Sequence, residues 1–152
     1  MKPITLSLCL LLATVLANSQ NLNPAYDSTL AAALGADDYG MRPYVLAILK
    51  TGSNTEADRE TIQRCFAGHL ENIRRLAEEG KLIVAGPLGK NEQAYRGIFI
   101  LAVATLEEAE ELLQTDPAVA AKLLDADLYA WYGSAALPEY LPAADKIWKL
   151  KP

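Results

Sequence analysis

The sequence predicts an α+β domain in which two helices cover one face of a four-stranded antiparallel sheet. Two observations predict this class: apolar runs of strand length, and two longer segments whose apolar residues recur at the spacing of a half-buried helix. Along the chain they follow the order strand, helix, strand, strand, helix, strand. That order is typical of the ferredoxin-like βαββαβ fold.

The first half of the pattern contains two strands and the longer helix. Residues 44–50 are apolar almost throughout and form the first strand. Residues 61–79 form the helix, which ends at Gly80 because glycine readily adopts the left-handed conformation of a helix cap. Residues 82–85 form a short buried strand that a Gly-Pro pair ends.

The second half repeats the arrangement with a shorter helix. Residues 95–103 form a strand, and a capping box that begins at Thr105 starts a helix over 106–113. A further helical turn is expected over 116–124, and residues 128–132 form the last strand. The domain defined by these elements has the length and the apolar content to bury one sizeable core.

Three further segments surround the predicted domain, which spans residues 43–135. Residues 20–42 form a leader with a turn or two of helix, and residues 136–152 form a tail broken by prolines. Residues 1–19 resemble a secretory signal peptide.

The signal peptide is expected from one lysine, Lys2, followed by an apolar run over 4–16 that is too short to span a membrane. Small residues then allow cleavage after Ala17 or after Ser19. Cys9 lies inside the apolar run and not after a small residue at its end, so a lipid anchor is not expected. We therefore expect an exported protein, periplasmic or secreted, without a stable membrane anchor.

The composition excludes several classes of partner and cofactor. The formal net charge of −5 argues against nucleic acid, because phosphate binding needs clustered Lys and Arg. Cys65 is the one thiol outside the signal peptide, and it fits a small buried residue better than a nucleophile. No glycine-rich phosphate loop or metal-ligand spacing is present, so neither a cofactor nor a metal is expected. Four glutamates form a solvated helix face: Glu107, Glu108, Glu110 and Glu111.

The single histidine, His69, is the most informative residue. It lies seven residues after Ile62 and four before Ile73, in the apolar face of the predicted helix. An imidazole held there is either a core residue bonded to a neighbour or a base waiting for a substrate. Asp116 has the same ambiguity: before Pro117 it is a good helix N-cap, yet its second oxygen could also orient an imidazole.

The two faces of the predicted sheet differ in their cover. Both helices lie on one face, while the strands over 44–50 and 95–103 are apolar on both faces. A broad uncovered apolar face usually marks a partner surface. A second copy of the sheet is the simplest cover, and we therefore expect a homodimer with its sheets face to face.

Several segments together resemble the YCII-related family. They are Gly68-His69 on the first helix, residues 80–87 (GKLIVAGP) after it, and Thr115-Asp116-Pro117 in the second helical region. Residues 34–41 (LGADDYGM) are similar to the leader of an exported branch of that family. The resemblance covers roughly residues 42–135.

The resemblance implies a dimeric α+β barrel of ferredoxin-like subunits and a His–Asp active site, formed here by His69 and Asp116. A characterised member of the family removes hydrogen chloride from a chlorinated hydroxymuconate-type compound, while most members have no assigned substrate. Cytoplasmic members often carry an arginine three residues before the histidine. This chain has Phe66 there, with Arg64 nearest, so no anion-holding role is expected.

Two functions follow as hypotheses. In the first, His69 is a general base for proton transfer, in elimination or isomerisation, on an unknown small organic molecule. In the second, the domain is a non-catalytic small-molecule-binding or interaction module. The surroundings of His69 and Asp116, an open pocket or a filled core, distinguish the two.

Overall fold

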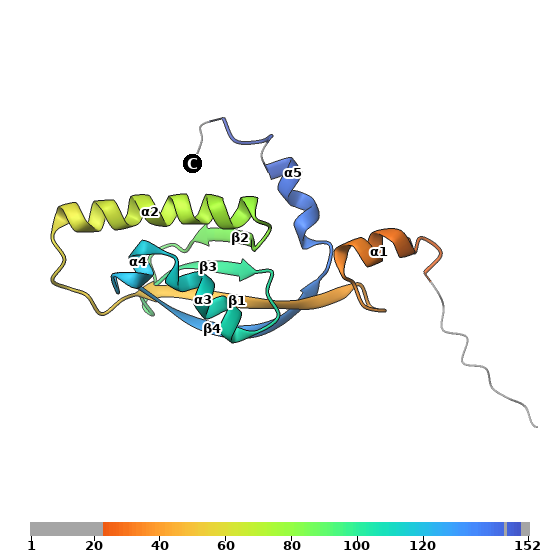
Figure 1. Ribbon diagram of the computed structural model, residues 1–152, viewed down its shortest axis with the longest axis horizontal. Helices are drawn as coiled ribbons and strands as arrows, with labels where there is room; N and C mark the ends of the chain where they lie inside the picture. Colours follow the sequence, from red (N-terminus) through yellow and green to blue (C-terminus); the bar gives the residue numbers. More distant parts are fainter. Residues whose placement is uncertain (1–22, 145, 150–152) are drawn as a thin grey trace, which may run out of the picture.

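The computed structural model describes residues 23–144 and 146–149, and the predicted signal peptide lies outside them. Figure 1 shows the arrangement of the helices and strands. In chain order they are α1 (Ser28–Leu34), β1 (Met41–Thr51), α2 (Arg59–Glu78), β2 (Leu82–Pro87), β3 (Tyr95–Leu101), α3 (Leu106–Gln114), α4 (Pro117–Ala120), β4 (Leu124–Ser134), the 3-10 helix η1 (Leu137–Tyr140) and α5 (Leu141–Ala144).

The four strands form one antiparallel sheet in the order β2-β3-β1-β4. Ala47 in the central strand β1 pairs with Phe99 on one side and with Leu128 on the other. The strand order and the alternation with helices confirm the predicted α+β, ferredoxin-like fold.

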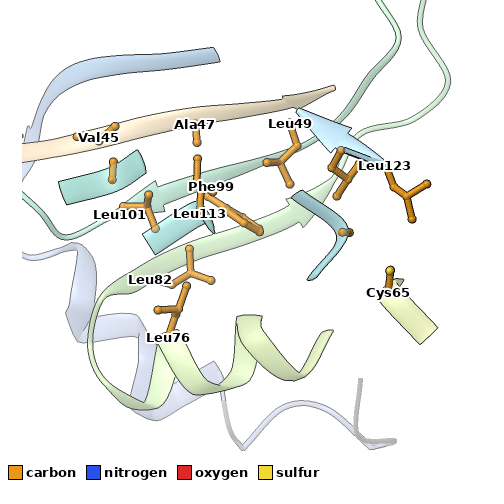
Figure 2. Packing of buried hydrophobic residues seen from close by; sticks show 13 residues of the cluster. Val45, Ala47, Leu49, Cys65, Leu76, Leu82, Phe99, Leu101, Leu113 and Leu123 are labelled. Carbon is orange, nitrogen blue, oxygen red and sulfur yellow. The ribbon is translucent and has the colours of Figure 1, made fainter. Parts of the chain in front are cut away.

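The core lies between the sheet and helices α2, α3 and α4. Alternate residues of β1 and β3 point to the helices, because successive side chains of a strand face opposite sides. Figure 2 shows how they pack against the helices. The sheet contributes Val45, Ala47, Leu49, Phe99 and Leu101, and the helices contribute Cys65, Leu76, Ala109, Leu113 and Ala118.

The prediction for the last helical turn and the last strand is wrong in its boundaries. The turn expected over 116–124 ends at Ala120, and the strand begins at Leu124 instead of 128. Lys122 adopts a φ of +55°, in the left-handed region, and this stops the helix. The early part of β4 escaped the prediction because Asp125 and Asp127, on the edge strand, interrupt its apolar pattern.

The leader and the tail attach to one end of the sheet, where β1 begins and β4 ends (Figure 1). The carboxylate of Asp37 accepts hydrogen bonds from the Tyr132 hydroxyl and from the backbone N–H groups of Tyr39 and Met41. In the tail, the Tyr140 hydroxyl donates to the carbonyl oxygen of Ile83 in edge strand β2. Both contacts fix a terminal segment to the domain.

The second face of the sheet has an apolar centre, bordered at one end by the ion pair of Lys50 and Asp127, and has no core helix on it. The register places Leu46 and Ile48 of β1 beside Ile98 and Ile100 of β3 there, and all four are partly exposed. Tyr129 of β4 lies on the same face and is half exposed. This is the surface expected between two copies of the chain, and the homodimer stays a prediction.

Among the described residues, no helix combines the length and the apolar character needed to cross a lipid bilayer.

Candidate functional site

Helix α2 holds His69 against the sheet. Asp58 caps the helix through the Thr61 N–H, and the helical repeat then places His69 on the same side as the core residues Cys65 and Leu76. The imidazole stacks on the Phe99 ring, with centroids 5.9 Å apart and planes 19° apart. The His69 side chain is 12% exposed, so it lies at the edge of the core.

The chain places Asp116 in the link between α3 and α4. Asp116 is the N-cap of α4, and its Oδ1 accepts the N–H of Ala118 at 2.9 Å. Pro117 follows at the first helical position, where a missing N–H costs nothing. The Asp116 side chain has no exposed surface. A buried carboxylate needs hydrogen-bond partners for both oxygens, because desolvation without them is costly.

The second carboxylate oxygen is bound to the imidazole. Nδ1 of His69 lies 2.5 Å from Oδ2 of Asp116. An ionised carboxylate can only accept hydrogen bonds, so Nδ1 is the donor and the lone pair of the neutral ring is on Nε2. Asp116 therefore caps a helix and fixes the histidine tautomer at once, which combines the two interpretations of this residue. The catalytic role of the pair stays a prediction.

The other ring nitrogen, Nε2 of His69, has no hydrogen-bond partner among the described residues. In that part of the chain no buried side-chain nitrogen or oxygen lacks a partner. Nε2 is therefore not fully buried. Phe66 packs edge-on to the same ring, with centroids 6.0 Å apart, so the exposed part of the imidazole has an apolar border.

A close contact between helices sets the position of this pair. A Cβ atom on Gly68 would lie 2.8 Å from Cγ of Pro117, closer than real Cβ contacts come. Glycine at 68 thus lets α2 approach α4 closely enough for the next residue, His69, to reach Asp116.

A polar network on α2 lies beside the pair, and the sequence analysis missed it. Nη2 of Arg75 donates to Oδ1 of Asn72 at 2.7 Å and to Oγ1 of Thr115 at 2.8 Å, and Nη1 donates to Glu79. Asn72 is only 6% exposed. One signal could have found it: Asn72 is a polar residue in the apolar face of the helix, three residues after His69.

The remaining residues singled out in the sequence have structural positions. Cys65 is a free, buried thiol within the core cluster. Arg64 is exposed and its Nη2 donates to Thr61 on its own helix. Among the residues that the structure describes, no group of three or more His, Cys, Asp or Glu side chains could hold a metal ion.

Two surface hollows have linings that the structure describes. They have volumes of about 400 and 310 Å³, and neither is lined by His69 or Asp116. The larger is bordered by Glu110, Leu113, Gln114, Val119, Asp125, Ala126, Asp127, Leu128 and Tyr129. The smaller is bordered by Ser53, Asn54, Thr55, Glu56, Ala121 and Lys122.

Fold and site together define a small ferredoxin-like α+β domain with a histidine–aspartate pair between two of its helices. The chain belongs to the YCII-related domain family, whose sequence profile matches residues 44–131. This match confirms the family resemblance for the domain, whereas assignment to an exported branch stays a prediction.

The solved structures similar to this chain include the 5-chloro-2-hydroxyhydroquinone dehydrochlorinase from Burkholderia phenoliruptrix AC1100, in complex with 2,5-dihydroxybenzoquinone. The two chains are 18% identical, and the TM-score is 0.42 over 57% of this chain and 92% of the other. No curated protein matches the chain.

Proposed function

We propose that the protein is a cofactor-free enzyme that uses His69 as a general base on a small organic molecule, with Asp116 as the residue that orients the base. The reaction class is proton transfer leading to elimination or isomerisation. The proposal includes export to the periplasm or the medium, which the predicted signal peptide supports.

One observation carries this proposal. Nδ1 of His69 is bound to a fully buried carboxylate at 2.5 Å, while Nε2 has no partner among the described residues and is not fully buried. A core histidine that served packing alone would have no need for a ring nitrogen that is unpaired and not fully buried. An oriented base needs this arrangement, because one nitrogen must be fixed and the other must be able to accept a proton.

The chemistry follows from the pair. Nε2 takes a proton from the substrate, and the electron pair left behind either expels a leaving group or moves within the substrate. In isomerisation the imidazolium returns its proton to a different atom. The Asp116 carboxylate stabilises the imidazolium that forms between these steps. A positioned general base of this kind contributes roughly 10²- to 10⁴-fold to a rate.

The proposal includes a homodimer formed through the uncovered sheet face. The apolar side chains Leu46, Ile48, Ile98 and Ile100 on that face support it. A second sheet packed there would bury them and close a barrel with the helices outside.

A binding screen followed by turnover assays tests the function. Mature protein is screened against a metabolite library, and each hit is incubated with wild type and with His69→Asn, which keeps much of the side-chain volume but removes the titrating base. We expect turnover by wild type and a loss of roughly two to four orders of magnitude in the variant, with stability largely kept.

Arg64→Ala, an exposed change on the same helix, is the control and should leave the rate unchanged. Two results would contradict the proposal. One is an unchanged rate in a stable His69→Asn variant. The other is hits that bind to wild type without ever being converted, which would instead identify a binding module.

A further inference from the structure

We infer that Arg75 is a positioning residue: its guanidinium ties the α3–α4 turn to helix α2 and thereby holds Asp116 against His69. This inference rests on the proposed function, because it assigns Arg75 a part in orienting the base. Arg75 lies two turns from Gly68 along α2 and contacts neither member of the pair in the hydrogen bonds of the described residues.

The hydrogen bonds of Arg75 are compatible with those of Thr115. The Thr115 hydroxyl lies 2.6 Å from the Leu112 carbonyl oxygen and 3.1 Å from Oδ1 of Asn72 and can donate to either, while Oγ1 accepts from Arg75. Nη2 carries two hydrogens, so it can donate to Thr115 and to Asn72 at the same time. The third contact, from Nη1, goes to Glu79, the C-cap residue of α2. Only the contact to Thr115 leaves the helix.

Three consecutive residues of the turn each contact α2. Pro117 packs on Gly68, Asp116 binds His69, and Thr115 accepts from Arg75. Gly68 and Arg75 are about 10 Å apart along α2, and Thr115 and Pro117 are at most about 7 Å apart along the turn. The contact between Asp116 and His69 therefore lies between two anchors, which are Pro117 on Gly68 at one side and Thr115 on Arg75 at the other.

The two anchors differ in kind. The Pro117 contact is a steric limit on how close α4 comes to Gly68, and it does not pull the turn toward the helix. The Arg75 contact is attractive, and Asn72 fixes the guanidinium for it from a nearly buried position. Without Arg75, Thr115 keeps its 3.1 Å hydrogen bond to Oδ1 of Asn72 as a tie to α2. We expect this weaker tie to let the turn move away from the helix, which lengthens the bond between Asp116 and His69.

The single histidine of the sequence gives a readout that needs no substrate. In untagged, ¹⁵N-labelled protein the imidazole signals belong to His69 alone, and the resonance of the Nδ1 proton reports its hydrogen bond to Asp116. We would record these signals in Arg75→Met, which keeps the apolar stem. The matched control is Glu79→Gln, which removes the charge that Arg75 contacts at the C-cap of α2 and keeps the contact to Thr115.

We expect Arg75→Met to move the Nδ1 proton signal toward its position in Asp116→Asn, and Glu79→Gln to leave it unchanged. Thr115→Val should act like Arg75→Met, and Thr115→Ser, which keeps the hydroxyl, should restore the wild-type signal. Once a substrate is known, kcat of Arg75→Met should fall about tenfold with KM little changed, because the orientation of the base and not binding is affected.

The outcomes separate this inference from the proposed function. A wild-type Nδ1 signal in folded Arg75→Met, when Asp116→Asn does move it, overturns the role of Arg75 and leaves the His69–Asp116 pair intact. If Asp116→Asn does not move the signal, the pair itself and with it the proposed function fail. If Arg75→Met does not fold, the comparison of Thr115→Val with Thr115→Ser decides, and equal signals in those two overturn the inference.

Discussion

Gly68 and Pro117 pack so closely that a Cβ atom on the glycine would lie 2.8 Å from Cγ of the proline ring. These two residues are the chain neighbours of His69 and Asp116, whose side chains meet at 2.5 Å. The separation of α2 and α4 is thus set one residue away from the pair. The helix contact of Gly68 with Pro117 and the candidate active site of His69 with Asp116 therefore occupy adjacent positions on the same two segments.

Gly68→Ala should therefore loosen the pair. Overpacking at the Pro117 ring should cost about 1–3 kcal/mol, partly offset by about 1 kcal/mol of improved helix propensity. Thermal melts and the His69 Nδ1 proton signal measure the two effects. In a double-mutant cycle, Pro117→Ala should reduce the cost of Gly68→Ala, because it removes the Cγ atom that the new methyl meets. Additive effects in that cycle would contradict the steric account.

Substitutions of Asp116 should separate its two tasks. Asn is a good N-cap, so Asp116→Asn should keep most of the stability but lower the rate by roughly 10²- to 10⁴-fold, because an amide no longer fixes the tautomer or stabilises an imidazolium. Asp116→Ala removes the cap and leaves Nδ1 without its partner, at a cost of about 2–4 kcal/mol. Chemical denaturation and turnover assays check both. Equal losses of stability in the two variants would argue against a capping role.

The hydrogen bond from the Tyr132 hydroxyl to Asp37 in the leader predicts that the stability of the fold depends on pH. The hydrogen bond from Tyr132, and then that from the Met41 N–H, lower the pKa of Asp37 below its ordinary value. A carboxyl group with a lowered folded-state pKa stabilises the fold above its unfolded-state pKa, and this contribution is lost as pH falls through the folded-state value.

Tyr132→Phe should accordingly raise the pKa of Asp37 and lower the melting temperature at neutral pH, with the difference vanishing in acid. An NMR titration of the Asp37 carboxyl group measures its pKa, and thermal melts at neutral and at acidic pH measure the difference in stability. Tyr26→Phe in the leader is the control, because Tyr26 is exposed and its hydroxyl makes no hydrogen bond among the described residues. A difference between wild type and Tyr132→Phe that persists in acid would show that the effect does not come from Asp37.

The sheet face predicts the oligomeric state. We expect the mature protein to have the mass of two chains in light scattering, and Ile98→Arg, which places a charge on the uncovered face, to have the mass of one. Leu70→Arg is the control, since Leu70 is an exposed apolar residue on α2, and it should stay dimeric. A monomeric wild type at micromolar concentration would contradict the face-to-face dimer.

The sequence was sufficient for the fold because its signals are local. The apolar spacing of α2, the left-handed Gly80 after it and the Thr105 capping box each involve a few neighbouring residues, and all three are present in the structure. The start of β4 was not predictable in the same way, since its acidic residues lie at a sheet edge that only the complete topology defines.

The site was only partly predictable for a related reason. His69 and Asp116 stand out by type and by position in their helices, and the structure does bring them together. The Gly68–Pro117 contact and the bond between Arg75 and Thr115 depend on the distance between two helices, which no local pattern contains. Such contacts need the assembled fold before they can be recognised.

The ¹⁵N chemical shifts of the His69 imidazole, recorded in untagged protein at a pH where the ring is neutral, decide whether Asp116 orients His69 as a base. We expect a protonated Nδ1 and an unprotonated, solvent-accessible Nε2, and we expect Asp116→Asn to weaken this preference. A ring protonated on Nε2 instead would contradict the proposed role of His69, because the nitrogen assigned to take up the substrate proton would already carry one.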